Sequence, residues 1–143
     1  MSSVNRIVAI FSMLIVLGNA GRDKPVFSDD VKEVIEHVHN KCVGKTGVAE
    51  EDITNCEKGI FKNDQRLKCY MFCLFDEASL VDKNGCVDFD LMVKMMPDVY
   101  SARFESGVNI CKKEETMDKE ACQRAFDMHT CMYKSDPEFY FLL

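Results

Sequence analysis

The sequence lacks the features of a multidomain protein. It has no internal repeat, no low-complexity segment and only three prolines, and its 143 residues are enough for one domain. It also lacks an excess of basic side chains, because 24 acidic residues outnumber 18 basic ones and give a net charge of −6. An acidic chain gives no support for binding to nucleic acid or to an anionic membrane surface.

Motifs for catalysis and for metal binding are also missing. A secreted phospholipase is the natural enzymatic rival for a small helical chain rich in cysteine, but it needs a His-Asp pair beside adjacent cysteines, and neither is present. No serine-nucleophile motif occurs, and the three histidines form no pair with zinc-ligand spacing. The "DKNG" turn at 82–85 resembles a calcium loop, but Val87 and Val93 stand where that loop needs Gly and Glu. We therefore expect no enzymatic activity, no metal and no cofactor.

Only the N-terminus has a long apolar run. Arg6 precedes the segment "IVAIFSMLIVL", and Gly18 and Ala20 then supply small residues. This order predicts a secretory signal peptide over residues 1–20, cleaved after Ala20. A short membrane anchor is the alternative, although the run is below the ~18 residues that a spanning helix needs. Residues 21–143 are then expected to form one secreted domain that does not insert into a membrane.

The hydrophobic spacing of the remaining sequence is helical. Val31, Ile35 and Val38 fall on one face of a helix, and similar stripes recur along the chain. No segment alternates with a period of two. These patterns predict an all-α fold with about six helices, at 28–42, 48–57, 64–81, 88–96, 98–112 and 118–134.

Cys69 and Cys73 stand four residues apart within the third predicted helix. Residues at this spacing share one helical face with their Cβ atoms ~5–6 Å apart, whereas a disulfide needs about 3.5–4.5 Å. We therefore expect each cysteine to bond a different neighbouring helix, which makes the third helix the hub of the fold. The eight cysteines allow many pairings, so spacing alone does not choose the partners.

Six of the eight cysteines have a recognisable spacing. Gaps of 26, 3, 37, 10 and 8 residues separate Cys42, Cys69, Cys73, Cys111, Cys122 and Cys131. This spacing is similar to the signature of the insect odorant-binding and pheromone-binding proteins. The segments "CVGKTGVAEEDI", "LKCYMFCLFDEA", "VDKNG", "KEACQRAFDMHTC" and "KSDPEFYFLL" resemble the dipteran subgroup of that family. The resemblance covers essentially all of residues 26–143.

The resemblance implies three disulfides, which are Cys42–Cys73, Cys69–Cys122 and Cys111–Cys131. Cys56 and Cys86 lie outside the family pattern. They can form a fourth bridge, stay as free thiols or bond another molecule, and the sequence leaves these alternatives open. The implied fold is all-α, with about six helices around an internal apolar cavity and three or four disulfides as cross-links.

The composition is rich in flexible apolar side chains, with nine methionines, ten phenylalanines and no tryptophan. Methionine occurs in ordinary cores, but it is also an adaptable lining for apolar binding sites. The resemblance implies a carrier that encloses a small hydrophobic volatile molecule. By position, the ligand-binding residues that it implies are Phe75, Ala78, Phe89, Met92, Met96, Phe104, Val108, Met128, His129, Met132, Tyr140 and Phe141.

The C-terminal segment 135–143 ends in "FYFLL". An exposed apolar tail promotes aggregation, so we expect this segment to fold back as a lid. The resemblance implies that the carboxylate of Leu143 bonds His39 and Tyr70 and forms a pH switch. Protonating the carboxylate weakens the lid, whereas protonating His39 alone strengthens the pair, so the sign of the pH effect stays open. The alternative for His39 is a surface histidine at a helix end.

The leading interpretation is a secreted carrier of odorants or pheromones in sensillar lymph. Its partners are then the small hydrophobic volatile ligand and an odorant receptor, and the carrier is a monomer or a weak homodimer. The first alternative is a carrier used outside olfaction, for example in haemolymph, saliva or reproductive fluid. The second is a secreted interaction or structural protein with a filled core and no ligand.

Overall fold

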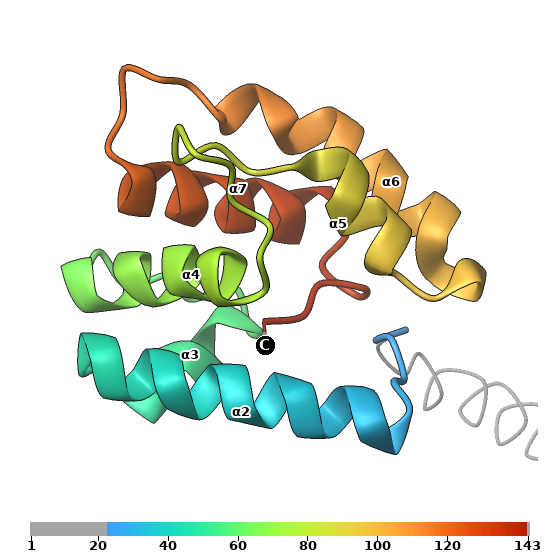
Figure 1. Ribbon diagram of the computed structural model, residues 1–143, viewed down its shortest axis with the longest axis horizontal. Helices are drawn as coiled ribbons and strands as arrows, with labels where there is room; N and C mark the ends of the chain where they lie inside the picture. Colours follow the sequence, from blue (N-terminus) through green and yellow to red (C-terminus); the bar gives the residue numbers. More distant parts are fainter. Residues whose placement is uncertain (1–22, 143) are drawn as a thin grey trace, which may run out of the picture.

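The computed structural model describes residues 23–142, and these residues form a bundle of α-helices (Figure 1). The helices are α2 (Asp29–Thr46), α3 (Glu50–Cys56), α4 (Gln65–Glu77), α5 (Phe89–Met95), α6 (Asp98–Cys111) and α7 (Ala121–Ser135), with a 3-10 turn, η1 (Lys112–Glu114), after α6. The described residues hold no β-strand, only an isolated bridge between Val81 and Val87. The predicted all-α fold is confirmed, while the predicted signal peptide, residues 1–20, lies outside the described residues.

Helix α4 lies between α2 and α7 and packs against both (Figure 1). Its side chains supply much of the buried core, including Leu67, Tyr70 and Met71, each with 0% exposure. Helix α6 packs on α7 and on α5, so α5 and α6 form a second group beside this stack. After α7, the chain turns back and runs into the space between the two groups, as Figure 1 shows.

Three disulfides join these helices. Cys42–Cys73 links α2 to α4, Cys69–Cys122 links α4 to α7, and Cys111–Cys131 links α6 to α7. These pairs are the ones that the resemblance implies. Both cysteines of α4 bond outward to different helices, as the geometry of the i, i+4 pair requires. Helix α4 is therefore the covalent as well as the packing centre of the bundle.

Cys56 and Cys86 do not form the fourth bridge that the cysteine count allows. Cys56 ends α3 and is buried, with its thiol donating to the carbonyl oxygen of Asp52 at 3.3 Å. Cys86 lies in the loop before α5, next to the sulfur of Met117. Figure 1 shows the reason, because α3 lies beside α2 whereas this loop lies beside α7, with α4 between them.

Aspartate side chains cap two of the predicted helices. Asp64 accepts from the backbone N–H of Arg66 and Leu67, and Asp88 accepts from the N–H of Leu91. Such caps satisfy backbone donors that have no partner inside the helix. The last helix was predicted to begin at residue 118, but α7 begins three residues later, at Ala121, with Glu120 at the N-cap. Helix α2 continues four residues past Cys42, until Gly47 turns the chain in a left-handed conformation.

The third predicted helix, 64–81, is too long. Helix α4 ends at Glu77, and Ser79 adopts a positive φ of 58°. The N–H of Leu80 bonds the carbonyl oxygen of Phe75 at 2.9 Å, which closes the helix end in the manner of a Schellman turn. Val81 then pairs with Val87 instead of continuing the helical stripe.

Candidate functional site

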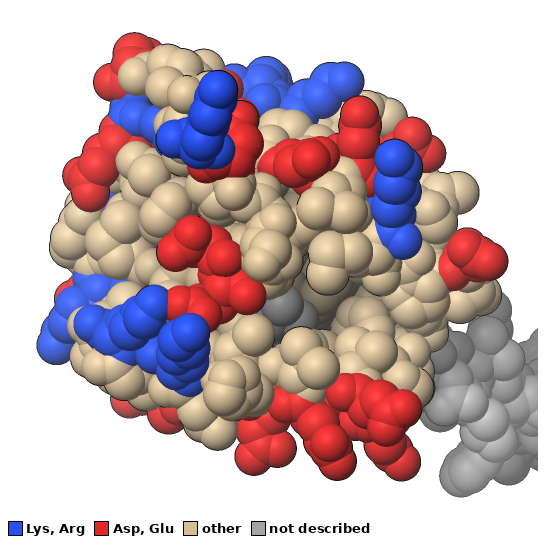
Figure 2. All heavy atoms as spheres, in the orientation of Figure 1, with Lys and Arg blue, Asp and Glu red and all other residues tan. Residues whose placement is uncertain are grey.

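An apolar pocket of about 380 Å³ lies between the α2–α4–α7 stack and the α5–α6 pair. Figure 2 shows this face hollowed near its middle, with uncharged side chains around the hollow and acidic side chains along the edge over α2. Every helix of the two groups contributes to the lining, and so does the returning tail. A concave, mostly apolar site of this size is typical of a small-molecule binding site.

Ten of the twelve expected ligand-binding residues line the pocket: Phe75, Ala78, Met92, Met96, Phe104, Met128, His129, Met132, Tyr140 and Phe141. Phe89 and Val108 do not. Val108 is only 2% exposed and packs into the core one turn beyond Phe104, toward the α6–α7 disulfide. Phe89 packs against the core at the first turn of α5, whereas the pocket meets the last turns of that helix.

The sequence did not single out α2 as a wall of the pocket. Four of its apolar residues line it: Val31, Val34, Ile35 and Val38. The helical stripe was visible in the sequence, but periodicity cannot tell a face that meets solid core from one that meets a hollow. Val34 and Met95, with 62% and 58% exposure, place apolar surface at the pocket mouth.

Ser79, Leu80 and Gly107 also line the pocket, although the sequence did not point to them. Ser79 and Leu80 reach the pocket because α4 ends at Glu77. Gly107 of α6 lines the wall opposite Met132, and a Cβ atom built on this glycine would lie 3.1 Å from the Met132 methyl carbon. The missing side chain at Gly107 therefore makes room for Met132 and for the pocket beside it.

His129 is a titratable polar residue of the pocket lining. Its ring stacks on Phe75, with 5.3 Å between the ring centroids and 19° between the planes. Its Nδ1 atom lies 3.1 Å from the hydroxyl oxygen of Tyr140, while Nε2 is buried and has no hydrogen-bond partner among residues 23–142. Burial lowers the pKa of His129 to about 4, so the imidazole is neutral at physiological pH.

An ion pair fixes the base of the tail. Arg103 of α6 donates from Nε and Nη2 to the two carboxylate oxygens of Asp136, at 2.6 and 2.8 Å, and from Nη1 to Asp23. Hydrogen bonding to Arg103 lowers the pKa of Asp136, and the guanidinium also covers the ring of Phe139. The tail therefore leaves α7 in a defined direction, toward the pocket.

The aromatic residues of the tail are packed rather than exposed. Phe139 and Tyr140 are 3% and 5% exposed. The ring of Phe141 meets the edge of Phe27, just before α2, at a centroid distance of 5.6 Å. The described part of the tail thus forms one wall of the pocket.

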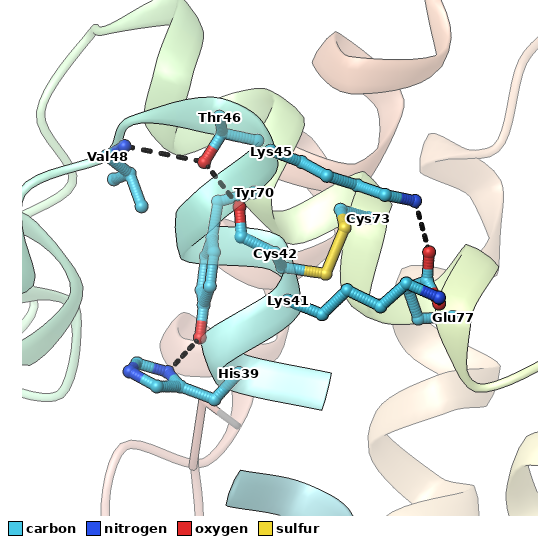
Figure 3. The surroundings of a disulfide bond; sticks show 9 residues. All are labelled: His39, Lys41, Cys42, Lys45, Thr46, Val48, Tyr70, Cys73 and Glu77. Carbon is cyan, nitrogen blue, oxygen red and sulfur yellow. Dashed lines mark hydrogen bonds and ion pairs between the residues drawn. A yellow bond between two sulfur atoms is a disulfide. The ribbon is translucent and has the colours of Figure 1, made fainter. Parts of the chain in front are cut away.

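The proposed switch residues fall on two neighbouring helices (Figure 3). His39 Nδ1 lies 2.7 Å from the hydroxyl oxygen of Tyr70, and His39 Nε2 lies 2.9 Å from a carboxylate oxygen of Glu50. The Cys42–Cys73 disulfide holds these two segments together. Burial raises the pKa of Tyr70, so its phenol stays protonated. Leu143, the third member of the switch, lies outside the described residues.

Figure 3 also shows two lysines and a glutamate beside the same disulfide. Lys41 and Lys45 on successive turns of α2 both bind Glu77, the last residue of α4. The two ammonium groups lower the pKa of Glu77 by hydrogen bonding. These two ion pairs join α2 to α4 at the edge of the pocket. The negative charge of Glu77 is therefore already paired with two lysines.

Three potential metal ligands lie together within the part of the chain that the structure describes. Cys69, Glu120 and Cys122 lie close enough together to hold an ion, but the two sulfur atoms are already joined in a disulfide. Burial raises the pKa of the Cys56 thiol to about 12, so this cysteine does not supply a thiolate at neutral pH. Within residues 23–142, no helix combines the length and the apolar composition that crossing a membrane requires.

The model of the PBP/GOBP family matches residues 25–135, which includes nearly all of the helical bundle. The chain belongs to the PBP/GOBP family. It is 30% identical over 104 residues to general odorant-binding protein 72 of Anopheles gambiae, a match that covers 70% of this chain and 85% of that protein. The family prediction from the cysteine spacing is confirmed.

Solved structures of insect odorant-binding proteins share the PBP/GOBP fold seen here. Odorant binding protein 5 of Apis mellifera superposes with a TM-score of 0.74 at 27% identity, covering 82% of this chain and 98% of that one. Odorant binding protein 7 of Anopheles gambiae gives a TM-score of 0.67 at 22% identity, covering 82% and 100%; that structure has four disulfide bridges and contains an azo compound. Family and fold together support a small-ligand carrier role, in a family of carrier proteins that are not known as enzymes.

Proposed function

We propose that the protein is a secreted carrier that binds a small hydrophobic odorant or pheromone in the pocket and transports it through aqueous lymph. The observation that carries this proposal is the pocket of about 380 Å³, lined by methionine and aromatic side chains from helices that disulfides hold together. An empty cavity lowers stability. Cross-links that constrain the unfolded chain offset this loss, so the bundle can keep its centre open.

The experiment is displacement of a fluorescent apolar probe, N-phenyl-1-naphthylamine, by volatile apolar compounds. We expect saturable binding of one probe molecule per protein and competitive displacement. Ala78→Trp places a large ring in the pocket and should abolish binding, whereas Ala102→Trp, on the exposed side of α6, should not. Equal binding by both variants, with circular dichroism showing intact helices, would place the probe elsewhere and contradict the proposal.

The C-terminal segment 135–143 acts in this proposal as a lid with pH-linked release. Three observations support a lid: the burial of Phe139 and Tyr140, the contact between Phe141 and Phe27, and the hydrogen bond that joins His39 to Tyr70. The carboxylate of Leu143 is the proposed third partner of that pair. Ligand affinity as a function of pH, compared with that of a chain lacking residues 139–143, tests the lid, and an unchanged pH dependence in the shortened chain would exclude it.

Secretion is typical of the PBP/GOBP family, and the signal peptide at residues 1–20 is proposed on that basis. The proposal includes sensillar lymph as the location, an odorant receptor as a downstream partner, and a monomeric or weakly dimeric state. Use of the same pocket outside olfaction is the second candidate. Expression in antennae, as opposed to salivary or reproductive tissue, distinguishes the two.

A further inference from the structure

The buried imidazole of His129 has one unmet hydrogen bond. Nδ1 lies 3.1 Å from the hydroxyl oxygen of Tyr140, but Nε2 has no partner among the described residues, although it is buried. A buried polar group left without a hydrogen bond destabilises the fold. The ring of His129 forms part of the pocket wall, so a bound ligand is a suitable source of the missing partner.

The surroundings of Tyr140 decide which ring nitrogen carries the proton. Tyr140 is 5% exposed, and its hydroxyl group meets no partner in residues 23–142 other than His129. If Nδ1 held the proton, the hydroxyl proton of Tyr140 and the lone pair of Nε2 would both lack partners. If Tyr140 donates to Nδ1, the Nε2–H donor and the hydroxyl oxygen of Tyr140 lack partners instead. A phenol is a strong hydrogen-bond donor and a weak acceptor, whereas an imidazole nitrogen is a strong acceptor, so the second arrangement makes the stronger bond and leaves unmet the weaker acceptor. The favoured tautomer therefore presents Nε2–H.

The charged groups in the pocket lining are already paired. Arg103 binds Asp136 and Asp23, and Glu77 binds two lysines. The described lining therefore offers no unpaired cation to a carboxylate, and it contains two carboxylates of its own. A charged fatty acid would lose its hydration without gaining a counter-ion.

We propose that the ligand is a neutral, mostly apolar molecule with one hydrogen-bond acceptor, such as the carbonyl oxygen of a ketone, aldehyde or ester, and that this oxygen binds Nε2–H of His129. This inference rests on the proposed carrier function and specifies its ligand class. Nε2 is covered in the empty pocket, so the ligand displaces a covering side chain. Methionine side chains, which have three rotatable bonds, line the pocket at Met92, Met96 and Met132 and can make that adjustment.

The first test compares nine-carbon ligands of matched length in the displacement of N-phenyl-1-naphthylamine. We expect 2-nonanone to bind about fivefold or more tighter than nonane, because one net hydrogen bond is worth about 1 kcal/mol. Nonanoate should bind more weakly than 2-nonanone. His129→Phe keeps an aromatic ring on Phe75 and should lose the preference for the ketone, measured as the ratio of the 2-nonanone and nonane affinities within the same variant.

A matched control comes from the same aromatic cluster. Tyr133 packs against Tyr140 at a ring distance of 5.6 Å but does not line the pocket, so Tyr133→Phe should keep the ketone preference. Tyr140→Phe removes the group that fixes the tautomer and should reduce the preference. Nitrogen-15 NMR of the unmodified protein reads the tautomer directly and should find the proton on Nε2 of His129. If Tyr140 had only a structural role, it would not determine which of the two nitrogens is protonated.

The outcomes distinguish a failure of the proposed carrier function from a failure of the proposed ligand class. If the unmodified protein binds neither the probe nor any nine-carbon ligand, the carrier function itself is wrong. If it binds them but does not prefer 2-nonanone to nonane, or if His129→Phe keeps the preference, the ligand class is wrong and the carrier function stands. A proton on Nδ1 of His129 in the NMR spectrum would also overturn the inference, and this result does not depend on any variant folding.

Discussion

At the scale of single residues, His129 links the pocket to the stability of the fold. Burial lowers its pKa from 6.5 to about 4. The unfolded chain therefore binds a proton more readily than the folded protein does at intermediate pH. The stability that neutral His129 allows is complete above pH ~6.5 and is lost as the pH falls from there toward 4.

We predict that His129→Phe flattens the pH dependence of the free energy of unfolding. In the unmodified protein, this residue alone should remove about 3 kcal/mol between pH 7 and pH 4. Urea unfolding across this range measures the difference between the two proteins. His37→Gln is the matched control, because His37 is exposed on α2, and it should follow the unmodified protein. Parallel curves for all three proteins would contradict the burial argument.

Two glycines should respond in opposite directions to alanine substitution. Gly59 has a φ of +80°, and a Cβ atom there would lie 2.7 Å from the ring of Tyr133, so Gly59→Ala should destabilise the fold by at least about 1–2 kcal/mol. Gly44 lies inside α2 with no atom within 4 Å of the added carbon, so Gly44→Ala should stabilise by about 0.5–1 kcal/mol. Thermal unfolding measures both, and a stabilising Gly59→Ala would refute the packing described for Tyr133.

At the scale of helices, the apolar stripes predicted where helices exist, but not where the helix predicted over 64–81 stops. The stripe through Leu67, Met71 and Leu74 continues in the sequence to Val81, yet the chain leaves the helix at Ser79. No glycine or proline marks this turn, and serine rarely adopts a positive φ. The stop depends on tertiary contacts of Leu80 and Val81, which a one-dimensional pattern does not contain.

The disulfides should contribute unequally to stability. Cys69–Cys122 closes a loop with a separation of 53 residues and joins α4 to α7, whereas Cys111–Cys131 closes one of 20 residues. The chain-entropy model assigns about 4 and about 3 kcal/mol to loops of these lengths. We therefore predict that replacing the first pair with serines lowers the unfolding free energy by about 1 kcal/mol more than replacing the second, as measured in urea. The reverse order would argue against α4 as the hub.

At the scale of the whole molecule, the pocket combines what the sequence predicts with what only the fold supplies. Residues from α5, α6 and α7 were expected in the lining because of the family resemblance, and most of them are there. The α2 wall and the Ser79 turn were missed, because each depends on how separate elements face one another. The unmet donor on His129 is likewise invisible in the sequence, since it arises from the position of Tyr140.

The measurement that tests the carrier account most directly is NMR of carbon-13-labelled methionine methyl groups during titration with 2-nonanone. Five methionines line the pocket: Met92, Met95, Met96, Met128 and Met132. Met71 is buried in the core away from the pocket, and Met117 is 66% exposed on the surface, so both serve as internal controls. We predict saturable shifts of the lining methyl groups at one ligand per protein, with the two controls nearly unchanged. Shifts confined to Met117, or none that saturate, would contradict a ligand-carrying pocket.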